Sequence, residues 1–261
     1  MNGGSAEFRF YAELNDFLAP DRRFRAFTAD FAFGATVKDA IEALGVPHPE
    51  VDVILANHES VDFSYRMHDG DRIAVYPVFE SFDISSVTRL RPTPLRNTRF
   101  VIDANLGQLA RYLRLLGLDA EYSQQLTDSE LVHLSVAERR VLLTRDVGAL
   151  KHGSLTHGYF VRARDARAQV VEVLSRFDLF GSLAPLSRCA KCNGMLDPVD
   201  KQEIAHRLEP STRTHYDDFW VCERCDNVYW RGAHIVSIER FVQEVGSAAV
   251  EPATPPIQSG S

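Results

Sequence analysis

The chain has 261 residues, of which 45% are hydrophobic and 25% are charged, a composition typical of two or three ordinary globular domains. No apolar run approaches 18 residues, which excludes a membrane-spanning helix. No signal peptide is recognisable and the four cysteines have the spacing of metal ligands, so we expect a reducing, cytoplasmic setting.

The formal net charge of -7 is distributed unevenly along the chain. Residues 1–87 hold 7 Lys and Arg against 15 Asp and Glu, a net of -8, whereas residues 88–167 hold 13 against 8, a net of +5. A basic segment within an acidic chain is compatible with nucleic-acid binding, because the local charge attracts phosphates.

The first segment combines strands with one capped helix. Thr36 and Asp39 have the spacing of a capping box, which predicts a helix over residues 36–44. An Asp-Gly-Asp turn at residues 69–71 precedes the last strand of the segment. Strands are expected from Phe8, at 52–56 and at 72–76.

This order of elements, together with Asn57 and the stretch 69–78, resembles the ubiquitin-like (β-grasp) fold of sulfur carriers. Such carriers act through a free Gly-Gly terminus, whereas this segment continues through residues 79–82 into more protein. The resemblance therefore implies a small α+β accessory domain over residues 1–84, with an interaction role rather than sulfur transfer. Residues 3–5 are expected to be a flexible start.

Two segments are expected to lack a folded core. Residues 85–98 are basic and proline-containing, which disfavours a helix and predicts an extended linker. Residues 246–261 are mostly Ala, Pro, Gly and Ser, which predicts a disordered tail. The remaining domains are therefore expected between residues 99 and 245.

Between residues 99 and 177, short apolar runs alternate with amphipathic helical patterns. Such alternation is typical of an α/β domain with a parallel sheet. The strands are expected at 99–103, 140–146 and 159–162, and the helices at 107–116, from 127, and at 166–177.

Four aspartates of this α/β segment follow predicted strands or begin a predicted helix. Asp103 and Asp146 directly follow the first two strands, and the carboxyl ends of parallel strands share one edge of the sheet. Asp128, at a helix start, and Asp165, after the third strand, can reach the same edge. Converging carboxylates repel one another, and Mg²⁺ or Mn²⁺ relieves that repulsion. The pattern predicts metal-assisted hydrolysis of a phosphate ester by water.

Three of these acids also have a structural explanation. Asp128 can serve as a helix N-cap, and Asp146 can cap a turn. Asp165 can form surface ion pairs, because arginines stand at positions 162, 164 and 167 around it. The same arginines are alternatively phosphate contacts.

The four cysteines form two C-x-x-C pairs, Cys189 with Cys192 and Cys222 with Cys225, separated by 29 residues. This pattern is typical of a zinc ribbon, with an insertion between its two knuckles. A closed shell of four sulfurs leaves no coordination position for catalysis. The alternatives are disulfides or a thioredoxin-like redox motif, and a reducing compartment disfavours the disulfides.

Five segments resemble, in chain order, the Mut7-C family. They are residues 103–117, 127–131, 141–146, 188–194 and 228–234. The resemblance spans residues 99–240 and implies a PIN-like ribonuclease domain followed by a zinc ribbon, preceded here by the ubiquitin-like extension of some bacterial members. The corresponding boundaries are 99–183 for the nuclease domain and 184–245 for the ribbon.

The same resemblance assigns roles to the acids. It implies that Asp103, Asp128 and Asp146 bind catalytic Mg²⁺ or Mn²⁺, with Asp165 as the least defined fourth catalytic acid. Ala104 and Asn105 depart from the bulkier or basic pair expected after the first acid, which bears on substrate contacts.

RNA contacts are expected from cations of the basic segment and from a Trp-Arg pair in the ribbon, whereas Trp220 and Tyr229 are expected in the ribbon core. The RNA-contact candidates are Arg111, Arg114, Arg145, Arg162, Arg164, Trp230 and Arg231. We therefore predict a metal-dependent ribonuclease acting on structured RNA such as tRNA near an unpaired end, with no membrane partner. The alternative is a non-catalytic RNA-binding or regulatory protein in which the ribbon binds RNA.

Overall fold

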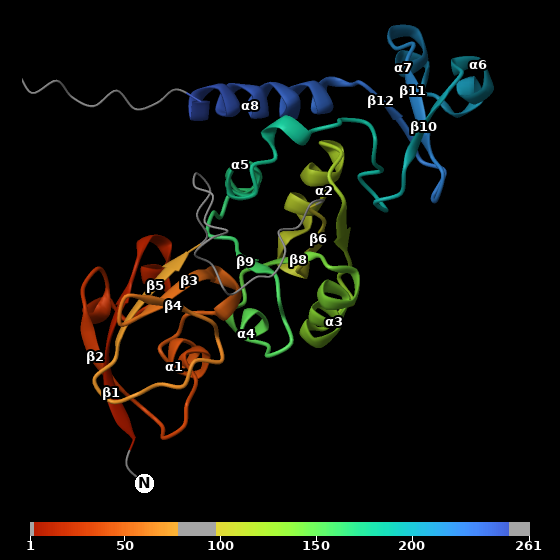
Figure 1. The fold of residues 1–261 in the computed structure, drawn as a ribbon. Helices are drawn as coiled ribbons and strands as arrows, with labels where there is room; N and C mark the ends of the chain where they lie inside the picture. Colours follow the sequence, from red (N-terminus) through yellow and green to blue (C-terminus); the bar gives the residue numbers. More distant parts are fainter. Residues whose placement is uncertain (1–2, 78–97, 251–261) are drawn as a thin grey trace, which may run out of the picture. The chain divides into compact units, whose positions relative to one another are not determined.

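The computed structural model describes residues 3–77 and 98–250. The predicted linker, apart from residue 98, and residues 251–261 of the predicted tail lie outside the described part of the chain. The chain forms two compact units, whose elements are labelled in Figure 1. The first unit contains Met1–Leu106 and Tyr122–Val161, and the second contains Gly107–Glu121 and Arg162–Ser261.

The N-terminal part of the first unit is a mixed five-stranded sheet with one α-helix, which confirms the expected β-grasp fold. The strand order is β2-β1-β5-β3-β4, with β1 and β5 parallel and the other pairs antiparallel. The elements are β1 (Gly4–Phe10), β2 (Phe27–Phe31), α1 (Val37–Ala43), β3 (Val51–Ala56), β4 (Glu59–Val61) and β5 (Arg72–Pro77), with 3-10 turns at Ala12–Phe17, Pro20–Arg22 and His48–Glu50.

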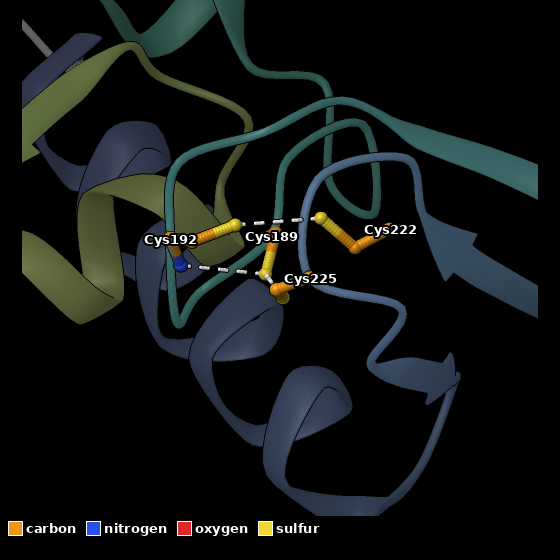
Figure 2. A group of neighbouring side chains, drawn as sticks. All are labelled: Cys189, Cys192, Cys222 and Cys225. Atoms are coloured by element: carbon orange, nitrogen blue, oxygen red, sulfur yellow. Dashed lines mark hydrogen bonds between the residues drawn. The ribbon is translucent and has the colours of Figure 1, made fainter.

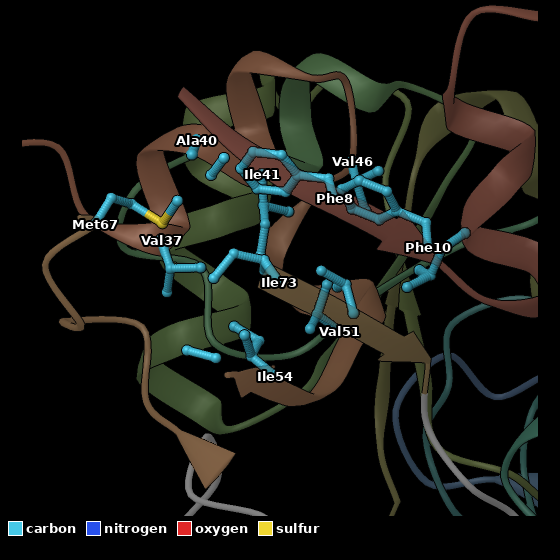
Figure 3. Packing of buried hydrophobic residues seen from close by; sticks show 14 of the residues in the cluster. Phe8, Phe10, Val37, Ala40, Ile41, Val46, Val51, Ile54, Met67 and Ile73 are labelled. Atoms are coloured by element: carbon cyan, nitrogen blue, oxygen red, sulfur yellow. The ribbon is translucent and has the colours of Figure 1, made fainter. Parts of the chain in front are cut away.

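The core of this domain lies between α1 and the sheet. Phe8 and Phe10 on β1 pack with Ile41 on α1 and Ile73 on β5, and all four are buried (Figure 3). Residues along β1 alternate between buried and exposed, so one face of the strand supplies both phenylalanines. Burial of each such side chain contributes about 1.5–3 kcal/mol.

The start of β1 corrects the expectation of a flexible segment at residues 3–5. Gly4 already pairs with Phe31 in the antiparallel ladder, and the Ser5 amide donates to Asp69 Oδ1 at 2.8 Å. The predicted Asp-Gly-Asp turn thus holds the beginning of the first strand. No local pattern predicts this contact, because the two partners lie 64 positions apart.

The rest of the first unit contains the predicted parallel sheet. Strands β6, β8 and β9 run parallel, and the sheet order is β7-β6-β8-β9. Leu131 and Leu150 from the neighbouring helices are buried against Val101 and Leu142 of the sheet. The elements are β6 (Phe100–Ile102), a 3-10 turn (Ala104–Leu106), α3 (Asp128–Glu138), β8 (Val141–Thr144), α4 (Val147–Leu150) and β9 (Gly158–Phe160). Strand β7 (Ala120–Tyr122) lies at the boundary, where the chain passes from the second unit back to the first.

Within the first unit, polar contacts join the β-grasp domain to the chain between α4 and β9. The His48 ring lies 2.6 Å from the Leu155 carbonyl oxygen through Nε2 and 2.6 Å from Glu42 Oε1 through Nδ1. The Phe160 amide donates to the buried carboxylate of Glu50. The His48 ring therefore joins the side chain of Glu42 on α1 to the chain just before β9.

The second unit contains two helices of the α/β segment and the cysteine-bearing ribbon. Helices α2 and α5 lie against each other, and β10, β11 and β12 form an antiparallel sheet. The short helices α6 and α7 lie between β10 and β11 and account for the long gap between the cysteine pairs. The elements are α2 (Gly107–Leu115), α5 (Ala166–Arg176), β10 (Leu196–Val199), α6 (Lys201–Ile204), α7 (Pro210–His215), β11 (Phe219–Cys222), β12 (Val228–Trp230) and α8 (Ala233–Val250), with 3-10 turns at Phe180–Ser182 and Ala205–Arg207.

Helix α8 corrects the predicted start of the tail at residue 246, because the helix continues to Val250. Ile235, Ile238 and Val242 lie at helical spacing on its buried face and anchor it. Among the described helices, none combines the length and the apolar composition needed to cross a membrane.

Candidate functional site

The carboxyl ends of β6 and β8 place two of the predicted acids on one hydrogen-bonded chain. Asp103 follows β6, is 6% exposed, and donates its amide to the Leu143 carbonyl oxygen at 3.0 Å. Thr144 Oγ1 donates to Asp103 Oδ2 at 2.6 Å and accepts from the Asp146 amide at 2.9 Å. Thr144 therefore links Asp103 to Asp146 at adjacent strand ends.

Asp146 also begins helix α4. Its Oδ1 accepts from the Gly148 amide at 2.6 Å, so the turn-capping role considered from the sequence is present. The other carboxylate oxygen has no hydrogen-bond partner among the described residues, and the side chain is exposed. Asp146 can thus act as an N-cap with one oxygen while the second faces solvent.

Asp128 is not the N-cap of its helix. Thr127 fills that position and forms a capping box with Glu130, whose side chain accepts from the Thr127 amide at 2.8 Å. Hydrogen bonds from the amide and the hydroxyl of Thr127 lower the pKa of Glu130. Asp128 is exposed at the first helical position with no hydrogen-bond partner in the described part of the chain. The N-cap explanation for Asp128 is therefore wrong.

Asp165 belongs to the second unit and is the N-cap of α5. Its Oδ1 accepts from the amides of Arg167 and Ala168 at 2.9 and 3.1 Å. The side chain is exposed. The capping role is therefore sufficient to explain why an aspartate stands at position 165, without metal binding.

The oxygen donors at the ends of β6 and β8 suit a hard divalent cation by type. Among the described residues, the four cysteines form a tight group able to hold a metal, whereas Asp103, Asp128 and Asp146 are not drawn together in the same way. Asp128 and Asp146 are exposed, whereas Asp103 is buried.

The predicted RNA-contacting arginines fall into different environments. Arg111 and Arg164 are exposed, whereas Arg162 is half-buried. Arg145 is half-buried and donates from Nη1 to the Val161 carbonyl oxygen at 3.0 Å. Of these four, Arg111 and Arg164 are the most accessible to a phosphate.

Arg114 corrects the prediction of an RNA contact. It is 3% exposed, and its guanidinium donates to the carbonyl oxygens of Ala120 at 2.7 Å and Lys191 at 3.0 Å. Burial lowers the pKa of Arg114. The helical pattern placed this residue beside the apolar stripe of α2, but the first cysteine knuckle covers it, so it holds the knuckle instead of RNA.

Asn193 is a structural residue that the sequence analysis missed. It is buried in the left-handed region at a φ of 65° and accepts from the Ala120 amide at 3.1 Å. Its Nδ2 donates to Asp119 at 2.8 Å and to Glu121 at 3.0 Å. The position directly after a C-x-x-C pair is the signal that could have indicated a left-handed turn there.

The four cysteine sulfurs converge from two loops (Figure 2). Cys189 and Cys192 precede β10, whereas Cys222 ends β11 and Cys225 lies in the turn after it. The Sγ atoms are 3.5 Å apart for Cys189 and Cys225 and 3.4 Å apart for Cys192 and Cys222. All ligand atoms lie within 4.8 Å of one another, close to the edge of about 3.8 Å expected for four sulfurs around zinc.

The surroundings of the sulfurs favour a metal over a disulfide or a redox pair. All four cysteines are free, and backbone amides of Cys192 and Arg224 point at Cys189 Sγ and Cys222 Sγ at 3.4 Å. The Tyr229 hydroxyl lies 3.1 Å from Cys189 Sγ. Donors arranged around sulfurs stabilise thiolates, the form that binds metal.

Burial and these same contacts change the pKa values of the cysteine thiols. Burial would raise the pKa of Cys189, but hydrogen bonds from Tyr229 and from the amides of Cys192 and Lys191 lower it to about 7. Burial raises the pKa of Cys192 to about 12. Burial and the contact with Cys189 also raise the pKa of Tyr229. A central cation that replaces the thiol protons satisfies all four sulfurs at once.

The ribbon aromatics divide as the sequence suggested. Trp220 and Tyr229 pack with the cysteine cluster and with Leu115 in the second unit, which confirms their core role. Trp230 is half-buried beside Tyr216, and Arg231 is exposed but paired with Glu239 at 2.7 Å. Of the predicted Trp-Arg pair, Trp230 is therefore better placed than Arg231 to meet a ligand.

An α/β domain with acids at adjacent strand ends, followed by a four-cysteine ribbon, is the arrangement that the sequence led us to expect of a nuclease-type protein. Residues 98–242 match the Mut7-C RNAse domain and residues 3–83 match the Mut7-C ubiquitin domain, in the predicted order. The chain therefore belongs to the Mut7-C family.

Two solved structures cover the N-terminal part alone. The chain is 23% identical to a crystal structure of H. volcanii small archaeal modifier protein 1, covering 29% of this chain and 98% of that chain with a TM-score of 0.24. It is also 23% identical to a crystal structure of SAMP1 from Haloferax volcanii, covering 30% of this chain and 100% of that chain with a TM-score of 0.25. No curated protein matches the chain.

Proposed function

We propose that this protein is a metal-dependent ribonuclease that hydrolyses RNA phosphodiester bonds at the carboxyl ends of β6 and β8. The observation that supports this most strongly is the hydrogen-bond chain from Asp103 through Thr144 to Asp146, within a segment that matches the Mut7-C RNAse domain. It fixes one buried carboxylate and one exposed carboxylate at adjacent strand ends, where α/β sheets bind ligands.

Asp103, Asp128 and Asp146 would hold Mg²⁺ or Mn²⁺, with Asp165 as the fourth and least supported acid. The ion would supply positive charge and Lewis acidity toward the phosphodiester. Thr144 keeps Asp103 in place by donating to Oδ2, and Oδ1, which accepts a longer hydrogen bond of 3.4 Å from the Asn105 amide, is its candidate ligand atom. The Gly148 amide orients Asp146 in the same way. These contacts reduce the reorganisation needed when an ion binds.

The cysteine quartet would hold a structural Zn²⁺, and the ribbon would help to bind RNA. Arg111, Arg145, Arg162 and Arg164 in the basic segment are candidate phosphate contacts, and Trp230 with Arg231 is the candidate stacking pair. The substrate we propose is a structured RNA such as tRNA, engaged near an unpaired end, and the compartment we propose is the cytoplasm.

A non-catalytic RNA-binding or regulatory role is the second candidate. One observation favours it: among the described residues, the cysteines converge on a metal site, whereas the carboxylates do not form a group of similar tightness. In that case the ribbon would bind RNA, and Asp146 and Asp165 would serve only as helix caps.

Cleavage of end-labelled RNA by the full-length, zinc-loaded protein separates the two candidates. We expect cleavage that requires Mn²⁺ or Mg²⁺ and decreases about 100-fold in Asp103→Asn and in Asp146→Asn, the loss typical of a disturbed metal site. Asp197→Asn, an exposed acid on β10, is the matched control and should cleave like the wild type. Equal cleavage by all four proteins would point to a contaminating nuclease and remove the proposed function.

A further inference from the structure

A pocket of about 570 Å³ lies within the second unit, between α2, the first cysteine knuckle, β12 and the start of α8. Leu115 and Ile235 form its buried apolar wall. Tyr216, Tyr229 and Trp230 contribute aromatic rings, and Arg111 and Lys191 contribute cations. The volume falls within the range of about 300–1,000 Å³ typical of small-ligand sites.

The aromatic side of the pocket is built around Trp230. Its ring centroid lies 6.2 Å from that of Tyr216, with the planes tilted by 47°. The Tyr229 hydroxyl is engaged by Cys189 Sγ and the Lys191 amide, at 3.1 and 3.3 Å, so the first cysteine knuckle fixes this second wall. An aromatic face held in this way can stack on a planar ring system.

Gly232 fixes the position of the indole. A Cβ atom at this residue would lie 2.9 Å from Trp230 Nε1 and 3.3 Å from Trp230 Cδ1. The backbone therefore passes against the edge of the ring as it turns into α8. A side chain at position 232 would displace Trp230 without removing any group that lines the pocket.

The two cations of the pocket have no competing carboxylate. Arg111 and Lys191 are exposed, and neither forms a side-chain ion pair or hydrogen bond among the described residues. Arg231, outside this pocket, is instead neutralised by Glu239 at 2.7 Å. Two unneutralised cations beside fixed aromatic rings suit a ligand that is planar at one end and anionic at the other.

We infer that this pocket binds one unpaired nucleotide of RNA, with its base on Trp230 and its phosphate between Arg111 and Lys191. The inference rests on the proposed ribonuclease function and deepens it, because it names an unpaired nucleotide as the part of the substrate that the ribbon holds. A nucleotide uses both halves of the site, whereas an acidic peptide would use the cations alone. Stacking of one base on an aromatic side chain contributes about 1–3 kcal/mol.

Binding of labelled oligouridylate, followed by fluorescence anisotropy, tests the inference in full-length, zinc-loaded protein carrying Asp146→Asn to suppress cleavage. Trp230→Ala should weaken binding by about 5-fold to 150-fold, whereas Trp230→Phe should retain most of it. Arg111→Ala and Lys191→Ala should each weaken binding and reduce its salt dependence, because each removes one phosphate contact. A blunt RNA duplex should show a much smaller effect of Trp230→Ala.

The matched controls are Phe33→Ala, an exposed aromatic residue of the β-grasp domain, and Arg213→Ala, an exposed cation on α7. Both should bind oligouridylate like the parent protein. Gly232→Ala should weaken binding as Trp230→Ala does while zinc content and thermal unfolding stay unchanged. This variant keeps every pocket side chain, so its effect reports the position of the indole.

Unchanged affinity in Trp230→Ala and Lys191→Ala would overturn the inference, as would stronger competition by an acidic peptide than by uridine monophosphate. The result is separable from the proposed function. Weakened binding by the pocket variants, in a protein whose wild type cleaves no RNA, would support the pocket and reject the nuclease. Metal-dependent cleavage together with unaffected binding would support the nuclease and reject the pocket.

Discussion

Arg114 shows at the scale of one residue that helical periodicity predicts which face of a helix a side chain lies on, but not how deeply that side chain is buried. From the sequence, it lies at the border of the apolar stripe of α2, as Arg111 does. In the structure Arg111 is exposed, whereas Arg114 is buried under the first cysteine knuckle. The covering segment begins more than seventy positions later in the chain, so no local pattern reports it.

Arg114→Ala should therefore destabilise the protein. It would leave the carbonyl oxygens of Ala120, Ala190 and Lys191 without their donor, at a cost of about 2–4 kcal/mol. Arg111→Ala on the same helix should change stability by less than about 0.5 kcal/mol. Urea unfolding of both variants measures the difference, and similar losses in the two would contradict the burial of Arg114.

Thr144 is the residue of the candidate site that sequence reasoning missed. Asp103 and Asp146 were predictable because each is an acid directly after an apolar strand. Thr144 ends the same strand, where a threonine is also an ordinary β-sheet residue. Its role depends on the register between β6 and β8, which places Ile102 opposite Leu143, and register is not readable from either strand alone.

At the scale of elements, signals contained within a few neighbouring residues predicted helix starts, whereas short elements that depend on distant pairing were not predictable. The helix starts at Thr36 and Thr127 were predictable, because a capping box is contained within four residues. Strands β2, β4 and β7 were missed, since they are short and depend on pairing with distant segments. The parallel sheet was predictable from alternation, whereas the helices within the ribbon insertion were not.

The two cysteine knuckles should depend on metal for their structure. Removing zinc with a chelator should unfold the ribbon, because the four clustered thiols, two of them buried, cannot replace the metal bonds with hydrogen bonds. Loss of the knuckle also removes the carbonyl partners of Arg114, so α2 should lose protection. Hydrogen exchange should show faster amide exchange in α2 and β10–β12 and unchanged exchange in β1–β5. Unchanged exchange in α2 would contradict this coupling.

At the scale of the whole molecule, the β-grasp domain shares a compact unit with β6, β8 and β9. The two family models match two domains in order, but they do not indicate the contacts of His48 and Glu50 with the chain between α4 and β9. Such contacts join residues more than one hundred positions apart, which a single sequence cannot indicate.

His48→Ala should weaken this unit, because it removes the contacts of the ring with the Leu155 carbonyl oxygen and the Glu42 carboxylate. We expect a loss of about 1–3 kcal/mol in the free energy of unfolding. His68→Ala is the control, since that ring is exposed and lies 3.8 Å from Asp71. Thermal unfolding should show a lower midpoint for His48→Ala alone, and matching midpoints would contradict a shared unit.

The central claim is that acids from separate strands and helices hold a divalent ion at the ends of β6 and β8. Manganese titration of the zinc-loaded protein, followed by the electron paramagnetic resonance of free Mn²⁺, measures this directly. We predict saturable Mn²⁺ binding that is abolished in Asp103→Asn, weakened in Asp146→Asn and Asp128→Asn, and preserved in Asp197→Asn. Equal Mn²⁺ binding by the wild type and a folded Asp103→Asn variant would contradict the account.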